Sequence, residues 1–260
     1  MPDHVFNGYE FHSPSVFFNE ARKTFKDLPS QNPWESSAKL LREQWEIGNF
    51  AVGLSLLRRQ SVEVRLSDEE PADGQLKVDG QLIDVQTRVL IRRGRRPAWE
   101  YRDREVSLEE QRQNAIEVSP EEATQWIRQA VEAKQDKQYT KQQKPFWLLI
   151  YATFATRGLN LDALVCAVRE LCPSNFDEVW LLTEIIHSSD NDGGFAIVPL
   201  YPATKGEFFP YEYRATSERA LGLRDIKPHP FGPLTVEARK PTVAVSRNDG
   251  ICSPMFALTI

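Results

Sequence analysis

Residues 71–86 read PADGQLKVDGQLIDVQ, and this stretch decides the fold that the sequence predicts. Asp79-Gly80 is the strongest short-range signal for a tight β-hairpin, because both residues tolerate the backbone conformation of a two-residue turn. We therefore expect strands over Gly74–Val78 and Gln81–Ile91, joined by this turn. Apolar and polar residues alternate along the second strand, which is typical of a strand with one face in the core.

The polar side chains of this hairpin are expected to meet at one spot. Asp84 and Gln86 are two residues apart on one strand, so they point to the same face of the sheet. Val85 between them faces the core. Because the turn is tight, Asp73, just before the first strand, returns to the level of Asp84. The sequence therefore predicts that two carboxylates and one amide converge beside the hairpin.

Converging carboxylate oxygens suit a hard cation such as Mg²⁺ or Mn²⁺, which prefers oxygen ligands. Such a cation can lower the pKa of a bound water and neutralise charge that builds on a phosphate. Asp73 and Asp84 are therefore candidate metal ligands for the hydrolysis of phosphodiester bonds.

Helix and strand signals flank the hairpin in a regular order. Asn32-Pro33 and Ser119-Pro120 are typical helix starts, because Asn or Ser caps a helix and Pro fits its first position. Helices are expected over residues 14–28, 33–59, 120–139 and 161–171, and further strands over residues 61–66, 146–155, 176–186 and 195–200. This order predicts an α/β fold in which helices flank a central mixed sheet.

Length and composition limit the classes of protein that this chain can form. Its 260 residues, 41% of them hydrophobic, are enough for one large core. The net charge of −5 excludes a globally basic nucleic-acid coat but allows a local basic groove. Three cysteines and four scattered histidines suggest neither a disulfide framework nor a zinc site.

The expected organisation is a core with two attachments. We expect an N-terminal helical arm over residues 1–32, a core over 33–200, and a C-terminal extension over 201–260 made of loops and short strands packed on the core. No stretch approaches the roughly 18 apolar residues of a membrane span, so no membrane partner is expected. The first ten residues lack a signal-peptide pattern, which favours a cytoplasmic location.

The hairpin and its neighbours resemble the PD-(D/E)XK, or restriction-endonuclease-like, nucleases. In that family an acid on a first helix precedes an Asp before a hairpin. An Asp or Glu, a spacer and a Lys follow on the second strand, and then a helix and a strand. This chain offers PAD at 71–73, DVQ at 84–86, a helix from Pro120 and a strand from Phe146, within a resemblance that covers about 33–200. It implies a restriction-endonuclease-like sandwich, a Mg²⁺ or Mn²⁺ cofactor, and hydrolysis of nucleic acid, with DNA as the first candidate substrate.

Two positions depart from the family pattern. Ala72 separates Pro71 from Asp73, and Gln86 occupies the position of the lysine. Lysine supplies a charge that orients or polarises the attacking water, whereas glutamine orients water by hydrogen bonds alone. Some active members of the family carry Gln or Glu there, so Gln86 is a candidate for positioning the water. Lys77 on the partner strand is one candidate source of the missing charge.

The resemblance also implies an acid on the helix that precedes the hairpin. Glu35, Glu43 and Glu46 are available there. Glu46 lies closest to the hairpin along the chain, so we take it as a third metal-site acid or a water-holding residue, with Glu43 second. A solvated position on the helix surface is the alternative for Glu46.

Basic residues after the hairpin are candidates for contacts with nucleic acid. Lys134, Lys137 and Tyr139 end the next helix, where the resemblance implies phosphate or water contacts and a solvated helix end is the alternative. Trp99 and Tyr101 could stack on bases. The densest basic cluster comprises Arg92, Arg93, Arg95 and Arg96. Arginine suits a phosphate backbone through its planar fork, although neighbouring acids make a solvated loop an equal alternative.

The sequence thus predicts a metal-dependent DNA endonuclease with Asp73, Asp84 and Glu46 at the metal and Gln86 at the water. The first alternative is a catalytically inactive fold of the same kind that binds nucleic acid or protein. The second is a structural or interaction protein that uses the aromatic C-terminal region. A homodimer is one expected assembly, because enzymes that cut both strands are commonly dimers, and partner proteins of a larger system are another.

Overall fold

The computed structural model describes residues 6–27, 38–90, 118–137, 139, 144–152, 159–185, 194–213 and 226–228. Its helices are α1 (Pro14–Asp27), α2 (Lys39–Arg58), α5 (Pro120–Gln135) and α6 (Leu161–Glu170). Its strands are β1 (Val62–Leu66), β2 (Gly74–Val78), β3 (Gln81–Leu90), β4 (Phe146–Ala152), β5 (Glu178–Ile185), β6 (Gly194–Tyr201), β7 (Phe209–Tyr213) and β8 (Ile226–Pro228). The fold is α/β, as predicted. None of the helices in these ranges is long and apolar enough to cross a membrane.

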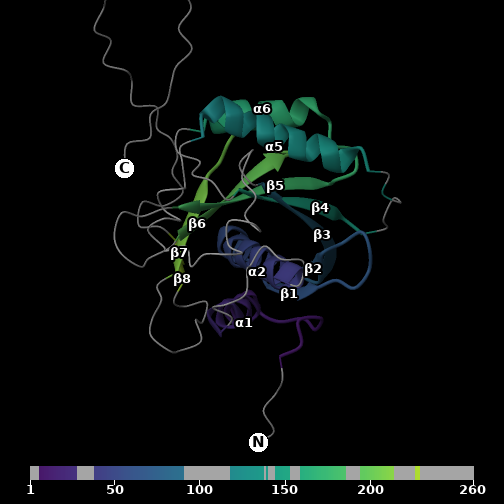
Figure 1. The fold of residues 1–260 in the computed structure, drawn as a ribbon, viewed down its shortest axis with the longest axis vertical. Coiled ribbons are helices and arrows are strands. Elements are labelled where there is room, and N and C mark those ends of the chain that lie inside the picture. The colour runs from purple at the N-terminus through teal and green to yellow at the C-terminus, as the bar shows by residue number, and fades with distance from the viewer. Residues whose placement is uncertain are drawn as a thin grey trace, which may run out of the picture.

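The eight strands form one mixed sheet in the order β1 to β8 (Figure 1). The first three strands are an antiparallel meander, β3, β4 and β5 are parallel, and the later strands are again antiparallel. Parallel neighbours need a crossover connection, which α5 supplies between β3 and β4 and α6 between β4 and β5. All seven residues of β4 are buried, as expected for a strand that is covered on both faces.

Helices cover the two faces of the sheet (Figure 1). Along β4, Trp147 and Leu149 belong to the core cluster under α1 and α2. Leu148 and Ile150 belong to the cluster under α5 and α6. The predicted central mixed sheet with flanking helices is therefore confirmed.

Helix α2 is the most enclosed helix of the described chain, with buried residues on every side. Two glycines allow this close packing. A Cβ on Gly48 would lie 3.1 Å from the Phe18 backbone, and a Cβ on Gly53 would lie 2.5 Å from the Tyr211 ring. These glycines therefore let α1 and β7 approach α2.

The structure tests the predicted hairpin turn and one of the two predicted helix starts. The hairpin turn is confirmed, with φ of 47° at Asp79 and 86° at Gly80. Helix α5 begins as predicted, because Ser119 and Glu122 form a reciprocal capping box. Helix α2 is described only from Lys39, so the predicted start at Asn32-Pro33 lies outside the described residues.

The two predicted attachments share the core and the sheet. In α1, Phe17 and Phe18 are fully buried in the same cluster as Ile47 of α2. Strand β7 pairs with β6 and places Tyr211 in that cluster as well. The division at residues 32 and 200 stays a prediction.

Candidate functional site

Asp73 lies just before β2 and is held against β3. Its backbone N–H donates to the Val85 carbonyl at 2.9 Å. Its Oδ2 accepts from the Thr87 backbone N–H at 2.7 Å and from the Thr87 hydroxyl at 3.2 Å. The half-buried carboxylate is thereby fixed across the predicted hairpin.

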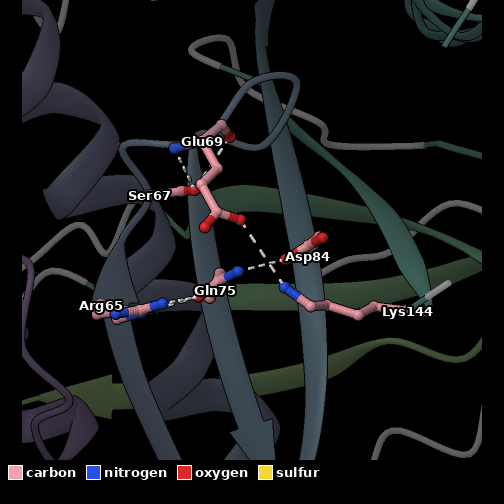
Figure 2. A network of polar contacts seen from close by, with 6 residues as sticks. All are labelled: Arg65, Ser67, Glu69, Gln75, Asp84 and Lys144. Carbon is pink, nitrogen blue, oxygen red and sulfur yellow. Dashed lines mark hydrogen bonds and ion pairs between the residues drawn. The ribbon is translucent and has the colours of Figure 1, made fainter. Parts of the chain in front are cut away.

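Asp84 lies on β3, and its side chain is 3% exposed. In the register of the sheet it faces Gln75 on β2 and Phe146 on β4. Its Oδ1 accepts from Gln75 Nε2 at 2.7 Å, and its second oxygen is turned away from Gln75 (Figure 2). Its backbone N–H donates to the Pro145 carbonyl at 2.9 Å.

Gln86 lies two residues further along β3, where its amide is buried and bound at both ends. Nε2 donates to the Pro71 carbonyl at 2.9 Å, and Oε1 accepts from the Tyr139 hydroxyl. Val85, between Asp84 and Gln86, lies in the α2-side core. The prediction that Asp84 and Gln86 share the opposite face of β3 is therefore confirmed.

Glu46 of α2 is buried in the core beside this hairpin. Its side chain is 2% exposed, and no hydrogen-bond partner reaches its Oε2. Burial raises the pKa of Glu46 to about 8, and the charges of Glu43 and Asp73 add to that rise while Arg42 opposes it. Glu46 is therefore a buried acid, and the alternative of a solvated position on the helix surface is wrong.

Glu43, one turn earlier, makes the more direct contact with Asp73. Burial raises the pKa of Glu43, as do the charge of Asp73 and a hydrogen bond between the two carboxyl groups. Lys39 pairs with the Glu43 carboxylate at 3.2 Å and opposes the rise. The like charges of two neighbouring carboxylates oppose each other's ionisation, and a positive charge beside them relieves that repulsion.

Lys134 of α5 also lies close to Asp73. It is 9% exposed, and burial lowers its pKa to about 8 while the charge of Asp73 opposes that fall. The same carboxylate affects Tyr139. Burial and the charge of Asp73 both raise the pKa of the Tyr139 hydroxyl. The charge of Asp73 thus acts both on acids of α2 and on a lysine of α5. We call Asp73, Glu43, Glu46, Thr87 and Lys134 the Asp73 cluster.

The other predicted basic residues lie elsewhere. Lys137 is exposed at the end of α5. Lys77 pairs with Leu82 near the turn and its Nζ binds Glu63 at 2.8 Å, a position that does not support the suggestion that it replaces the missing lysine. Arg92, Arg93, Arg95, Arg96, Trp99, Tyr101 and Glu35 lie outside the described residues.

Two residues that hydrogen-bond to the predicted carboxylates, Thr87 and Gln75, were not predicted from the sequence. Thr87 belongs to the alternating segment of β3, but nothing in that alternation marks its hydroxyl as a partner of Asp73. Gln75 was missed although it follows Asp73 by two residues. The register that pairs Gln75 with Asp84 follows from the predicted two-residue turn and could have revealed it.

The fit of a metal ion depends on the oxygen donors around Asp73. Within the described ranges, no three His, Cys, Asp or Glu side chains stand together as a ready metal site. The donor chemistry nevertheless suits a hard cation, because Asp73 and Glu43 both offer carboxylate oxygens and the charge of Asp73 raises the pKa of Glu43. The buried, unpartnered Oε2 of Glu46 adds a third oxygen of the same kind.

No family model matches the sequence, and a search of curated proteins finds no match. The geometry and charge of the Asp73 cluster are therefore the basis for assigning a function.

Proposed function

We propose that this protein is a restriction-endonuclease-like nuclease that hydrolyses phosphodiester bonds in nucleic acid, with DNA as the first substrate, using Mg²⁺ or Mn²⁺. One observation carries the proposal. The charge of the Asp73 carboxylate acts on Glu43 and Glu46 of one helix and on Lys134 of another. Acids beside a lysine at the end of a strand are the groups that a cation, a water and a phosphate require.

The order of elements supports the same proposal. Helix α2 is followed by the β1–β3 meander, then by α5, and then by β4 parallel to β3. This is the order that the sequence resemblance implies for the nuclease core. Asp73 and the Asp84–Gln86 segment occupy the hairpin positions expected from that resemblance.

Each residue of the site has a distinct role in this mechanism. Asp73 and Glu43 would hold the cation, with Glu46 beside them and Asp84 offering the oxygen turned away from Gln75. When bound, the cation supplies Lewis-acid activation of water and neutralises charge on the phosphate. Lys134 would supply the positive charge that Gln86 lacks.

The lowered pKa of Lys134 suits it to a second role, the exchange of a proton with water. A lysine whose pKa is lowered to about 8 exchanges a proton with water near neutral pH more readily than an ordinary lysine. Gln86 stays in place because both ends of its amide are bound. Lys134 would therefore orient the attacking water, while Gln86 and Tyr139 brace the wall of the site.

A catalytically inactive fold that binds nucleic acid or protein is the second candidate. The bound amide of Gln86 favours it, because Nε2 and Oε1 both have protein partners. Binding of nucleic acid with no cleavage and no dependence on a divalent cation would identify this function.

The test is a cleavage assay with the purified protein. Linear, circular and single-stranded DNA are incubated with Mg²⁺, Mn²⁺ or EDTA, with Asp84→Ala alongside. The matched control is Asp162→Asn, an exposed carboxylate on α6. We expect metal-dependent cleavage that Asp84→Ala removes and Asp162→Asn keeps. Undiminished cleavage by Asp84→Ala would refute the assignment of this hairpin.

A further inference from the structure

A row of three polar side chains crosses the first three strands (Figure 2). Arg65 on β1 faces Gln75 on β2, and Gln75 faces Asp84 on β3. The Arg65 guanidinium donates to Gln75 Oε1, with Nε at 2.8 Å, and Gln75 Nε2 donates to Asp84 Oδ1 at 2.7 Å. We call this row the Arg65 relay.

The chemistry of the relay fixes its direction. Arginine has only donors, so the amide oxygen of Gln75 must face Arg65. The NH₂ group of Gln75 must then face Asp84. Because Gln75 is 1% exposed, water cannot readily take over either contact. The two donors of Arg65 thereby prevent the flipped amide, which would present an oxygen to the Asp84 carboxylate.

We propose that Arg65 and Gln75 are positioning residues that hold the Asp84 carboxylate with one oxygen engaged, so that the other, turned away from Gln75, would be available to a cation. The inference rests on the proposed function, since it gives Asp84 a metal to face. Residues that hydrogen-bond to metal ligands fix the orientation of those ligands, and their loss typically weakens metal binding about 10- to 100-fold.

The N-terminal segment holds Arg65 from the outer edge of the sheet. The Arg65 guanidinium lies 4.8 Å from the centre of the Phe11 ring and 3.5 Å from the Tyr9 carbonyl oxygen. This segment runs beside β1, because His12 N–H donates to the Val64 carbonyl at 3.0 Å. The N-terminal segment therefore supports the relay although it is remote from Asp84 along the chain.

A neighbouring row of the same sheet provides a matched control. Glu63 on β1 faces Lys77 on β2, with an ion pair of 2.8 Å. That row ends at Leu82 on β3, which offers no polar group. Lys77→Met thus removes a cross-strand charge contact on the same face. Lys77 also lies over the Phe11 ring, at 5.8 Å from its centre, but none of the three hydrogen bonds of the Arg65 relay involves Lys77.

The test compares Arg65→Met, Arg65→Lys and Lys77→Met in the full chain. Mn²⁺ affinity is measured by calorimetry, the side-chain NH₂ resonances of Gln75 by NMR, and folding by thermal unfolding. We expect Arg65→Met to weaken Mn²⁺ binding about tenfold or more and to move the Gln75 resonances. Arg65→Lys, also a pure donor, should restore most of the affinity, and Lys77→Met should leave it unchanged.

The outcomes separate this inference from the proposed function. If the wild type binds Mn²⁺ and folded Arg65→Met binds it equally well, the relay does not position Asp84 and the inference is overturned. If Arg65→Lys fails to restore what Arg65→Met loses, a donor at this position is not what matters, which also overturns it. If the wild type binds no Mn²⁺ and cleaves nothing, the proposed function fails. Unmoved Gln75 resonances in Arg65→Met would then reject the relay independently.

Discussion

Replacing Glu46 by Gln should stabilise the protein, and the gain should grow with pH. Burial raises the pKa of Glu46 to about 8 from an ordinary value of 4.5. The folded protein therefore keeps a proton that the unfolded chain releases between these two pH values. The contribution of Glu46 to the stability of the wild type must fall as pH rises through this window, and it is constant below and above it. The side chain of glutamine does not ionise, so Glu46→Gln removes this pH-dependent contribution.

The size of the effect follows from the width of that window. Each pH unit within it corresponds to ~1.4 kcal/mol of unfolding free energy. At pH 7, below the folded pKa, the cost of Glu46 is on the order of 3 kcal/mol. Glu46→Gln should therefore gain little at pH 4.5 and most above pH 8. The shape of the side chain is retained, so core packing should not change.

Urea unfolding from pH 4.5 to 8.5 measures this difference directly, in EDTA so that no cation occupies the site. The matched control is Glu10→Gln, an exposed carboxylate of the N-terminal segment, whose difference from the wild type should not depend on pH. If the difference between Glu46→Gln and the wild type is flat across this range, Glu46 is not buried as a proton-holding acid. The Asp73 cluster would then contain only the acids Asp73 and Glu43, without Glu46.

Two further predictions concern the lysine of the site and the packing of α2. Lys134→Gln should lower single-turnover cleavage by about 10²-fold or more, because Lys134 is the buried lysine of the cluster. Lys137→Gln, at an exposed position, should leave the rate nearly unchanged. Equal rates for the two variants would exclude a chemical role for Lys134. Gly53→Ala should destabilise the fold by ~1–3 kcal/mol in urea unfolding, because its Cβ would meet the Tyr211 ring at 2.5 Å. An unchanged midpoint would show that Tyr211 does not pack there.

The hairpin could be predicted from sequence because its signals are local. Asp79-Gly80 sets the turn, and the two-residue period of the strand then places Asp84 and Gln86 on one face. Ser119 and Glu122 are similarly local, since a capping box needs only residues three apart. These parts of the fold depend on short stretches of chain and not on distant packing.

The choice among the acids and lysines could not be made from sequence. Glu43 and Glu46 lie three residues apart on one helix, so either could face Asp73 until the packing of α2 is known. The charge of Asp73 acts on Lys134 because the crossover through α5 places that helix against the parallel strands. Lys77 was the nearer choice along the chain, yet its ion pair with Glu63 keeps it at the other end of the hairpin.

The burial of α2 on every side could also not be predicted from the sequence. Gly48 and Gly53 suggest a weakened or bent helix when judged by propensity alone. In the structure they are contact points for α1 and Tyr211. Tertiary packing thus gives these glycines a use that local propensity does not reveal.

Single-turnover cleavage of DNA by Asp73→Asn tests the central claim most directly. Asparagine keeps the size of the side chain and one oxygen, but it removes the charge that Glu43, Glu46 and Lys134 all sense. The account predicts Mg²⁺- or Mn²⁺-dependent cleavage by the wild type, abolished in EDTA and lost in folded Asp73→Asn. Cleavage by Asp73→Asn at the wild-type rate would contradict the account, because the site would then work without the carboxylate at its centre.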